Sequence, residues 1–505
     1  MARAERAYRT GAKAMRNPTP HTGSLCHADI CCRRSTVMLT VVSISLAAAL
    51  PGCAVISTEG GIGAVQDVAG AALEKKVVAL RNTDDADMAH SAMRRLLRRP
   101  LSADAAVQLA LYNNRDLQAS YNALGISEAL MVRDSLPPSP GVSVLDVAGG
   151  GGLEIERRLV ANILALATLP ARAEIAADRF RQAQLRAALD TLQLAAETRR
   201  AYYRAVAARA SADFLNQAQT TAASAAQLSQ RLGESGALNK LDQARHQVFY
   251  AELTAELATA RRRASAERES LVRRIGLWGS DLDFRLPDAL PPLPSAPRAL
   301  SAVEVQAVRR RVDLQIARIE VAVLAKTLGL TNATRFVDLL EVAGISKTMQ
   351  EPGGSGFHES GAGIDLQVPL FDFGEARVRL AEETYMQAVN RLYAKAVNVR
   401  SQAREAYQAY RATYDIAQHY RNEVMPLRKI ISDEALLRYN AMQIDVFALL
   451  TEARQRIAST QAAIRADEEF WLADVNLGAA VLGGARGAAI EETTTAAADA
   501  AASRN

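Results

Sequence analysis

The sequence predicts a mainly α-helical fold with a small β part, in which long α-helical hairpins occur twice and strands lie between the helices. Three observations support this prediction. The body of the chain repeats itself, each copy holds a very long helical stretch, and each copy holds a glycine-rich segment of different periodicity. With 505 residues, of which 49% are hydrophobic, the chain is long enough to bury a large core.

The internal repeat is visible in two short matches. Residues 176–183 read AADRFRQA and residues 381–388 read AEETYMQA. Upstream of these, residues 116–118 and 313–315 both read DLQ. Because the matches keep the same order at similar separations, they indicate two copies of one unit of roughly 200 residues.

Both copies have the same predicted order of elements. A helical stretch comes first, a glycine-rich piece follows, and then a long helix leads to a break and a return helix. The ranges are 102–131, 172–232 and 239–275 for the helices of the first copy, and 301–329, 375–439 and 444–478 for those of the second.

The long helices carry the strongest periodic signal. In the second copy the apolar residues follow the alternating three- and four-residue spacing of a coiled-coil seam: Val389, Leu392, Ala396, Val399, Ala403, Ala406 and Tyr410. An arm covering 172–232 would span roughly 90 Å at about 1.5 Å per residue. No compact domain holds a helix of that length, so we expect projecting hairpins that pack side by side.

Between the helices we expect four β-strands per chain, two from each copy. Residues 363–368 alternate, with Ile364 and Leu366 on one face and Asp365 on the other, and 336–346 is a plausible partner. Polar residues 347–360 would form the loop between them. In the first copy we expect strands at 141–149 and 159–168, although 159–169 is also compatible with the end of a buried helix. Four strands cannot close a barrel alone, and open edges do not occur in lipid, so transmembrane strands would require several chains to share one barrel.

This organisation divides the chain into six segments. They are a leader with a lipoprotein-type signal peptide (1–53), an N-terminal lead-in (54–100), the first structural repeat (101–287), a proline-rich linker (288–299), the second structural repeat (300–482) and a disordered tail (483–505).

The leader has the features of an export signal. Two arginines precede an apolar run at 35–50, which is short for a membrane-spanning helix. The run ends in Leu50-Pro51-Gly52-Cys53, which resembles the site at which bacterial lipoproteins are cleaved and acylated on the cysteine. Cys53 is therefore the expected lipidation site, and Ala54 after it favours sorting to the outer membrane. The alternative is cleavage by an ordinary signal peptidase, with Cys53 incidental.

Composition argues against several classes of function. The net charge of +5 resides in the first 53 residues, which hold seven basic and two acidic residues, so the body is neutral and nucleic-acid binding is not expected. All four cysteines lie at or before Cys53, and the histidines lack the spacing of metal ligands. No phosphate-binding loop is present. We therefore expect no enzymatic activity, no metal site and no cofactor other than a covalent lipid on Cys53.

The region 101–482 resembles the TolC-like family of outer-membrane efflux proteins. The most specific match is the segment from Val368 to Gly374, VPLFDFG, which is similar to the strand-to-helix segment of that family. Its characteristic residues here are Pro369, Phe371, Asp372 and Gly374. Residues 114–117 and 311–314 resemble the openings of the two repeats, and 236–245 and 439–454 resemble the two periplasmic hairpin tips.

The resemblance implies a homotrimer with a 12-stranded outer-membrane barrel and a tunnel of helical hairpins in the periplasm. Such a protein is a passive exit duct that works with a periplasmic adaptor and an inner-membrane pump, for which the RND type is the first expectation. The alternatives are an exit duct for type I secretion and a non-conducting coiled-coil envelope lipoprotein. The cargo, whether a drug, a metal or a protein, is not encoded in any recognisable motif.

The resemblance also indicates where the periplasmic entrance lies. Some members of the family carry two rings of aspartate there, and the matching positions in this chain are Ala448 and Thr451. The nearest acids are Asp445 and Glu452, with Asp242 in the first hairpin tip. Our hypothesis is that Asp242, Asp445 or Glu452 replaces the missing carboxylates, since carboxylate rings favour cations. The alternative is that they are ordinary solvated helix acids.

Overall fold

A computed structural model describes residues 56–149, 152–299, 302–350, 354 and 356–483. The chain divides into two units, 1–53 and 54–505, and every described residue belongs to the second. Cys53, with the leader, and residues 484–505 of the tail lie outside the described residues.

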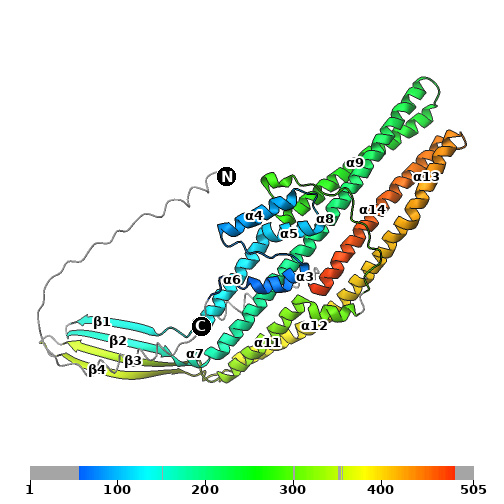
Figure 1. Ribbon diagram of the computed structural model, residues 1–505. Coiled ribbons are helices and arrows are strands. Elements are labelled where there is room, and N and C mark those ends of the chain that lie inside the picture. The colour runs from blue at the N-terminus through cyan, green and yellow to red at the C-terminus, as the bar shows by residue number, and fades with distance from the viewer. Residues whose placement is uncertain (1–55, 150–151, 300–301, 351–353, 355, 484–505) are drawn as a thin grey trace, which may run out of the picture. The chain divides into compact units, whose positions relative to one another are not determined.

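Two long helical hairpins dominate the described chain, in agreement with the predicted mainly α fold. The first consists of α8 (Leu169–Glu234) and α9 (Lys240–Ile275), and the second of α12 (Glu375–His419), α13 (Met425–Asn440) and α14 (Val446–Leu482). The 66 residues of α8 correspond to about 100 Å at 1.5 Å per residue. Within this unit α14 packs along α12 and α13 and also against α8, so the two hairpins lie side by side (Figure 1).

The two hairpins differ in one respect. Helix α8 runs without interruption, whereas a π-helical turn, η3 (Tyr420–Val424), separates α12 from α13. Pro426 follows in the first turn of α13, and because proline has no N–H it removes one hydrogen bond from the helical ladder at this point. Every predicted seam residue of α12 is buried or half-buried, which confirms the coiled-coil interpretation.

Each predicted opening stretch is divided into two helices. The first copy has α5 (Ala103–Asn113) and α6 (Arg115–Ser135), and the second has α10 (Val303–Arg310) and α11 (Val312–Ala333). The break at Asn114 has a physical cause, because its side chain accepts a hydrogen bond from the Leu117 N–H at 2.9 Å and donates to the Arg274 carbonyl at 3.0 Å. The break therefore also fixes α6 against the end of α9.

The lead-in packs against the first copy. It contains α2 (Ile62–Val65), the π-helical η1 (Gln66–Gly70), α3 (Ala71–Leu73) and α4 (Thr83–Leu97). Between α3 and α4 two glutamine side chains hold the backbone. Gln108 bonds both the N–H and the carbonyl of Lys76, at 3.1 and 2.9 Å, and Gln118 bonds the Leu80 N–H and the Val78 carbonyl, at 2.8 and 3.0 Å.

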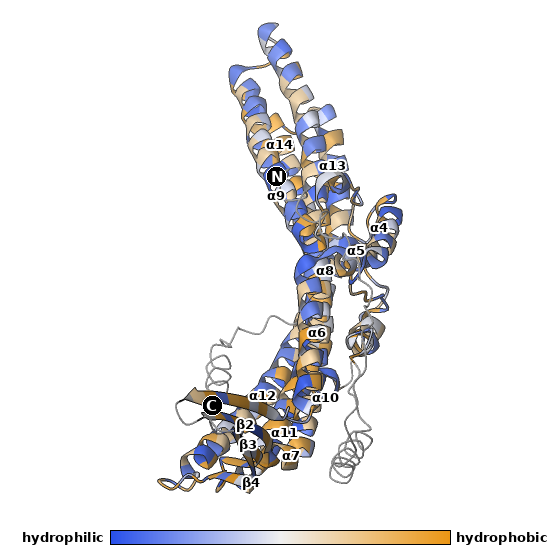
Figure 2. Cartoon of the chain, turned by 90° about the vertical axis from the view of Figure 1, so that its left-hand side faces the viewer, coloured by the Kyte–Doolittle hydropathy of each residue, from blue (hydrophilic) through white to orange (hydrophobic). Residues whose placement is uncertain are grey.

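The core is divided among the places where helices meet. One cluster joins α5, α8 and α9 to the end of α14, a second joins the lead-in, α6 and α8, and a third joins α10, α12 and α14. The third contains Tyr410 and Phe470, whose ring centres are 5.5 Å apart. Figure 2 shows that the hairpin helices carry apolar and hydrophilic residues together, as expected of helices that pack on one side only.

Four strands form one antiparallel sheet in the order β1-β2-β3-β4. Their bounds are Gly141–Gly149, Gly152–Asn162, Leu339–Gln350 and Gly356–Gln367. Strand β1 lies where it was predicted. The predicted strand at 159–168 is wrong, because β2 ends at Asn162, whose side chain accepts from the Ala165 N–H at 2.7 Å and begins α7 (Ile163–Ala167). The predicted loop at 347–360 is also too long, since β3 and β4 extend into it from both sides.

Candidate functional site

The sheet has two chemically different faces. The cross-strand pairs Val142–Leu159 and Val342–Ile364 lie on one face, together with Leu366, and this face is called the apolar face below. Its side chains are solvent-exposed in the single chain, with Ile364 at 76% and Val142 at 72%. The predicted separation of Ile364 and Leu366 from Asp365 is confirmed. Exposed apolar residues in a regular array mark a surface that another phase or chain covers.

The opposite face, called the charged face below, carries most of the charge of the sheet: Glu154, Glu156, Arg158, Glu341, Lys347, Glu359 and Asp365. The Lys347 ammonium lies 2.6 Å from the Glu154 carboxylate, and Glu156 and Glu359 are its direct cross-strand neighbours. An apolar face and a charged face on strands of about ten residues are typical of a barrel that separates lipid from a water-filled lumen.

The strand-to-helix motif forms a tight corner between β4 and α12. Asp372 accepts hydrogen bonds from the N–H groups of Gly374 and Ala376, at 3.0 and 3.3 Å, and therefore caps the helix. Gly374 has φ +73° and lies so close to the Arg335 carbonyl that a Cβ atom would overlap it. The Pro369 carbonyl accepts from the Phe373 N–H at 2.8 Å. Phe371, the remaining motif residue, points into solvent. The motif thus has a structural function, which is to set the angle between the sheet and α12.

The two hairpin tips are built alike. In the first tip the Ala237 N–H donates a hydrogen bond to the Leu232 carbonyl at 2.8 Å. In the second tip the Gln443 N–H donates to the Arg438 carbonyl, also at 2.8 Å. Both turns need a residue with positive φ. The first tip uses Gly236 at φ +75°, whereas the second uses Met442 at φ +59°.

The return helices begin with equivalent caps. Asn239 accepts from the Asp242 N–H, and Asp445 accepts from the Ala448 N–H, each at 2.8 Å. Asp242 and Ala448 therefore occupy the same position in the two tips. The acid that is missing at Ala448 is therefore present at the equivalent position of the first tip, as Asp242.

Each of the three candidate acids has a local partner. Asp242 pairs with Arg245 at 3.0 Å, Asp445 is the cap just described, and Glu452 pairs with Arg428 of α13 at 3.4 Å. Thr451 donates its hydroxyl to the Phe447 carbonyl at 2.8 Å. Asp445 and Ala448 are exposed, while Asp242, Thr451 and Glu452 are half-buried.

Contacts between the two return helices were not predicted. The Arg245 guanidinium lies 5.1 Å from the centre of the Phe447 ring, and that of Arg454 lies 5.5 Å from the centre of the Phe249 ring. Both distances are within the range of cation–π attraction. Behind them, Leu253 and Leu450 belong to one apolar cluster of α8, α9 and α14. Only the arginine in each return helix could have suggested this link, and its partner is too distant in sequence to be identified.

Acidic side chains on α14 are buried further from the tips. Burial raises the pKa of Asp467, Glu468 and Asp474, and the arginines near them offset part of this effect. Asp474 lies 3.0 Å from Arg298, and Glu468 lies 3.3 Å from Arg263. Near the first tip, burial lowers the pKa of His246, although Asp242 acts in the opposite direction.

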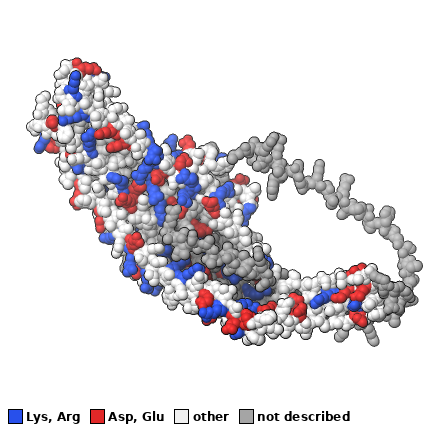
Figure 3. Space-filling model, turned by 180° about the vertical axis from the view of Figure 1, so that it is seen from behind, with Lys and Arg blue, Asp and Glu red and all other residues white. Residues whose placement is uncertain are grey.

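Charge is otherwise mixed over the helices. The face visible in Figure 3 shows basic and acidic side chains interspersed, without a large area of one sign. Within the described ranges no helix is both long enough and apolar enough to cross a bilayer. The same residues include no group of three or more His, Cys, Asp or Glu side chains that could hold a metal ion.

Comparisons of sequence and of structure gave different results. No family model matches the sequence, and the sequence matches no curated protein. The fold is similar to the Campylobacter jejuni CmeC outer membrane channel, with a TM-score of 0.64 and 17% identity over 79% of this chain and 88% of that one. It is similar to the outer membrane protein VceC from Vibrio cholerae, with a TM-score of 0.62 and 13% identity over 76% and 96%. It is also similar to the open state of the Neisseria gonorrhoeae MtrE outer membrane channel, with a TM-score of 0.60 and 16% identity over 75% of this chain and 88% of that one.

Proposed function

Because the chain has the fold of the TolC-like outer-membrane efflux channels, we propose that it is the exit duct of a tripartite efflux system in the outer membrane of a Gram-negative bacterium. Three copies would form a 12-stranded barrel from their four-stranded sheets, with the helical hairpins as a tunnel in the periplasm. We assign the chain no catalytic activity, since a duct conducts passively.

The observation that carries this proposal is the sheet. Strands β1 and β4 each have one unpaired edge, and the apolar face next to those edges is exposed. In lipid an unpaired edge costs several kcal/mol for each buried polar group, roughly as for any unsatisfied amide. Pairing β1 of one copy with β4 of the next would remove both edges. It would also turn the apolar face to the lipid and the charged face to the lumen.

The helices support assembly from several copies. Exposed apolar residues recur on the second hairpin at spacings of four, three and seven residues, at Tyr393 and Val397 of α12 and at Leu427, Ile430 and Leu437 of α13. Such a stripe is typical of a coiled-coil seam that lacks its partner. In the proposed trimer it would pack against the first hairpin of a neighbouring copy.

The energy for transport would come from partners. A duct of this kind needs a periplasmic adaptor and an inner-membrane pump, and we propose a pump of the RND type. The exposed hairpin tips, with Met442 and Leu241 at their surface, are the parts of the chain available to an adaptor.

A covalent lipid on Cys53 is also part of the proposal. The described chain resumes a few residues after it, where the Ser57 N–H donates to the buried Glu128 carboxylate at 3.0 Å. The start of the described chain is thus fixed to α6 at Ser57, four positions after the proposed anchor in the sequence. Treatment of the purified protein with lipoprotein lipase, followed by intact mass measurement, would reveal the acyl chains.

At the entrance we propose that cation preference depends on Asp242, Asp445 and Glu452, because Ala448 and Thr451 are uncharged. Neutralising all three should change the reversal potential of the reconstituted channel in a salt gradient. An unchanged reversal potential would show that these acids only cap and bridge the helices.

Two measurements test the function. Electron microscopy of particles extracted from outer membranes should show a threefold hollow cylinder, and planar bilayers should show ion conductance. A hollow trimer that conducts supports the duct, and identifying which pump co-purifies would separate efflux from type I secretion. A solid rod that does not conduct would instead indicate a coiled-coil envelope lipoprotein.

A further inference from the structure

The apolar face of the sheet carries one residue that does not fit an apolar environment. Arg157 of β2 lies on this face between Val144 and Ser346, and its side chain is exposed. Among the described residues no carboxylate lies within ion-pair distance of it. Asp146 is the acidic residue on the same face. It lies in the next row of this face toward the β1–β2 turn and forms no ion pair with Arg157. An unpaired guanidinium on a lipid-facing strand is tolerated only near a membrane interface.

The depth of Arg157 can be derived from the opposite end of the sheet. Exposed aromatic rings lie there, at Phe336 before β3 and at Phe371 after β4, as in the aromatic girdle of a barrel. Ten residues separate Phe336 from Ser346, and eleven separate Ser360 from Phe371. The strand parts of these intervals, Leu339 to Ser346 and Ser360 to Gln367, advance roughly 18 Å at about 3.3 Å per residue and a tilt of about 40°, and the three or four residues beyond each strand extend the span toward the roughly 25 Å height of the apolar band of such barrels. Ser346 and Ser360 are cross-strand neighbours in the row of Arg157, so this row lies at the outer interface.

The surroundings of Arg157 are suited to a headgroup. It borders a hollow of about 300 Å³, lined also by Val142, Leu159, Gly344 and Ser346 of the same face and by Arg158, Ile345 and Gly361, which lie on the charged face. Gly344 leaves open space, since no atom lies within 4 Å of the position of a Cβ there. One row further outward, His358 and Thr348 face each other at 3.3 Å. The hollow thus has an apolar side toward the proposed membrane core, and toward the outside the next row of this face consists of Asp146, Ile155, Thr348 and His358.

We propose that the row of Arg157 binds the phosphate group of an outer-leaflet glycolipid, with the acyl chains against the apolar face. This inference rests on the proposed function, because it requires the sheet to face lipid. The Arg157 guanidinium would form paired charge-assisted hydrogen bonds to the phosphate, whose geometry its planar fork matches. The Ser346 and Ser360 hydroxyls would donate to the remaining oxygens. In place of an aromatic girdle at this interface, the chain would use a cation that matches anionic headgroups.

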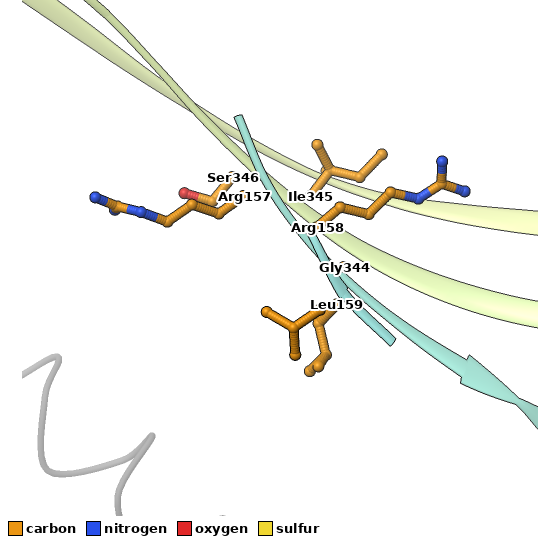
Figure 4. A pocket seen from close by; sticks show the side chains of 8 residues that line it. Arg157, Arg158, Leu159, Gly344, Ile345 and Ser346 are labelled. Atoms are coloured by element: carbon orange, nitrogen blue, oxygen red, sulfur yellow. The ribbon is translucent and has the colours of Figure 1, made fainter. Parts of the chain in front are cut away.

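The neighbouring residue provides a matched control. Arg158 has the same charge and follows Arg157 directly, but its side chain extends to the other side of the sheet (Figure 4). It lies on the charged face, between Ser143 and Ile345. Replacing either arginine by glutamine removes one charge from the same strand, from an exposed side chain on the apolar face at Arg157 and from a half-buried side chain on the charged face at Arg158.

The experiment uses the full-length protein, extracted in detergent, stripped of lipid and mixed with diphosphoryl lipid A. Native mass spectrometry then counts the bound lipid. R157Q should lower the apparent affinity about tenfold, as expected for the loss of one charge-assisted contact, R157K should be intermediate, and R158Q should match the wild type. If R157Q and the wild type bound lipid A with equal affinity, or if R158Q lost as much affinity as R157Q, the inference would be overturned.

A second measurement separates this inference from the proposed function. Conductance is recorded in bilayers of phosphatidylcholine without lipid A, where a duct should conduct whether or not Arg157 is present. A wild-type protein that conducts but does not bind lipid A overturns the lipid site alone. A protein that neither forms trimers nor conducts overturns the duct and, with it, the lipid site.

Discussion

The guanidinium of Arg454 lies 2.7 Å from the carboxylate of Glu252, and this contact joins the return helix of the second hairpin to that of the first. The same arginine lies over the Phe249 ring, and Arg245 lies over Phe447 in the reverse direction. Each hairpin therefore supplies an arginine to the other close to the tips. In the proposed duct the tips surround the entrance, so these contacts are among those that must change if one hairpin moves relative to the other near the tips.

The first prediction concerns the Glu252–Arg454 pair. E252Q should lower stability little, by at most about 1 kcal/mol, because both side chains are about half exposed and the pair is screened. It should nevertheless increase the fraction of time that the reconstituted channel is open, since it releases one hairpin from the other. The matched control is E256Q, one helical turn away on the exposed surface of α9. Equal open fractions in the two variants would exclude a role for the pair in holding the hairpins together.

A second prediction concerns the turn of the second tip. Met442 has φ +59° and is 94% exposed, so its side chain contributes little packing while its backbone adopts a conformation that favours glycine. M442G should therefore stabilise the tip by about 1 kcal/mol. G236A in the first tip should destabilise by a similar amount. M442A keeps the unfavourable backbone and is the control. Limited proteolysis at the tips measures both effects, and faster cleavage of M442G than of M442A would contradict the expectation.

The third prediction concerns the corner between sheet and helix. Gly374 combines positive φ with direct contact to the Arg335 carbonyl, so G374A should cost at least about 2 kcal/mol and reduce the yield of folded trimer. Gly478 of α14 is a suitable control, because its Cβ position is open and alanine is favoured in a helix by about 1 kcal/mol. Thermal unfolding of the detergent-extracted protein compares them. Equal melting temperatures would mean that the corner relaxes without cost.

The helical part of the fold could be predicted because its signals are local. Coiled-coil spacing and the glycines at 233 and 236 determine where α8 ends, within a residue or two. The strand bounds were harder, since residues 159–169 form one apolar run and only the cap at Asn162 divides strand from helix. Polar residues near 347–360 suggested a loop because the charged face of the sheet needs them. Contacts such as Arg454–Glu252 join residues about 200 positions apart, and no local pattern specifies them.

The last prediction concerns pH and the carboxylate of Asp474. Burial raises its pKa above 3.8, and the charges of Arg298 and Arg199 offset only part of that shift. The folded chain therefore binds this proton more tightly than the unfolded chain, so Asp474 lowers stability as the pH rises through the range just above 3.8. D474N removes that cost, and its free energy of unfolding at pH 7 should equal or exceed that of the wild type. The advantage should shrink as the pH falls toward 4.

Asp104 provides the opposite case within the same helical region. Burial acts to raise its pKa, but hydrogen bonds and charges from Arg199 and Lys75 outweigh this and lower the pKa below 3.8. Its contribution to stability is present above 3.8 and is lost as the pH falls through the lowered value. D104N should therefore be less stable than the wild type at pH 7, and the difference should shrink only below about pH 4. Denaturant unfolding of both variants between pH 3 and 8 measures the two slopes. If the stability of D474N relative to the wild type changed with pH in the same direction as that of D104N, the arginines near Asp474 would outweigh its burial.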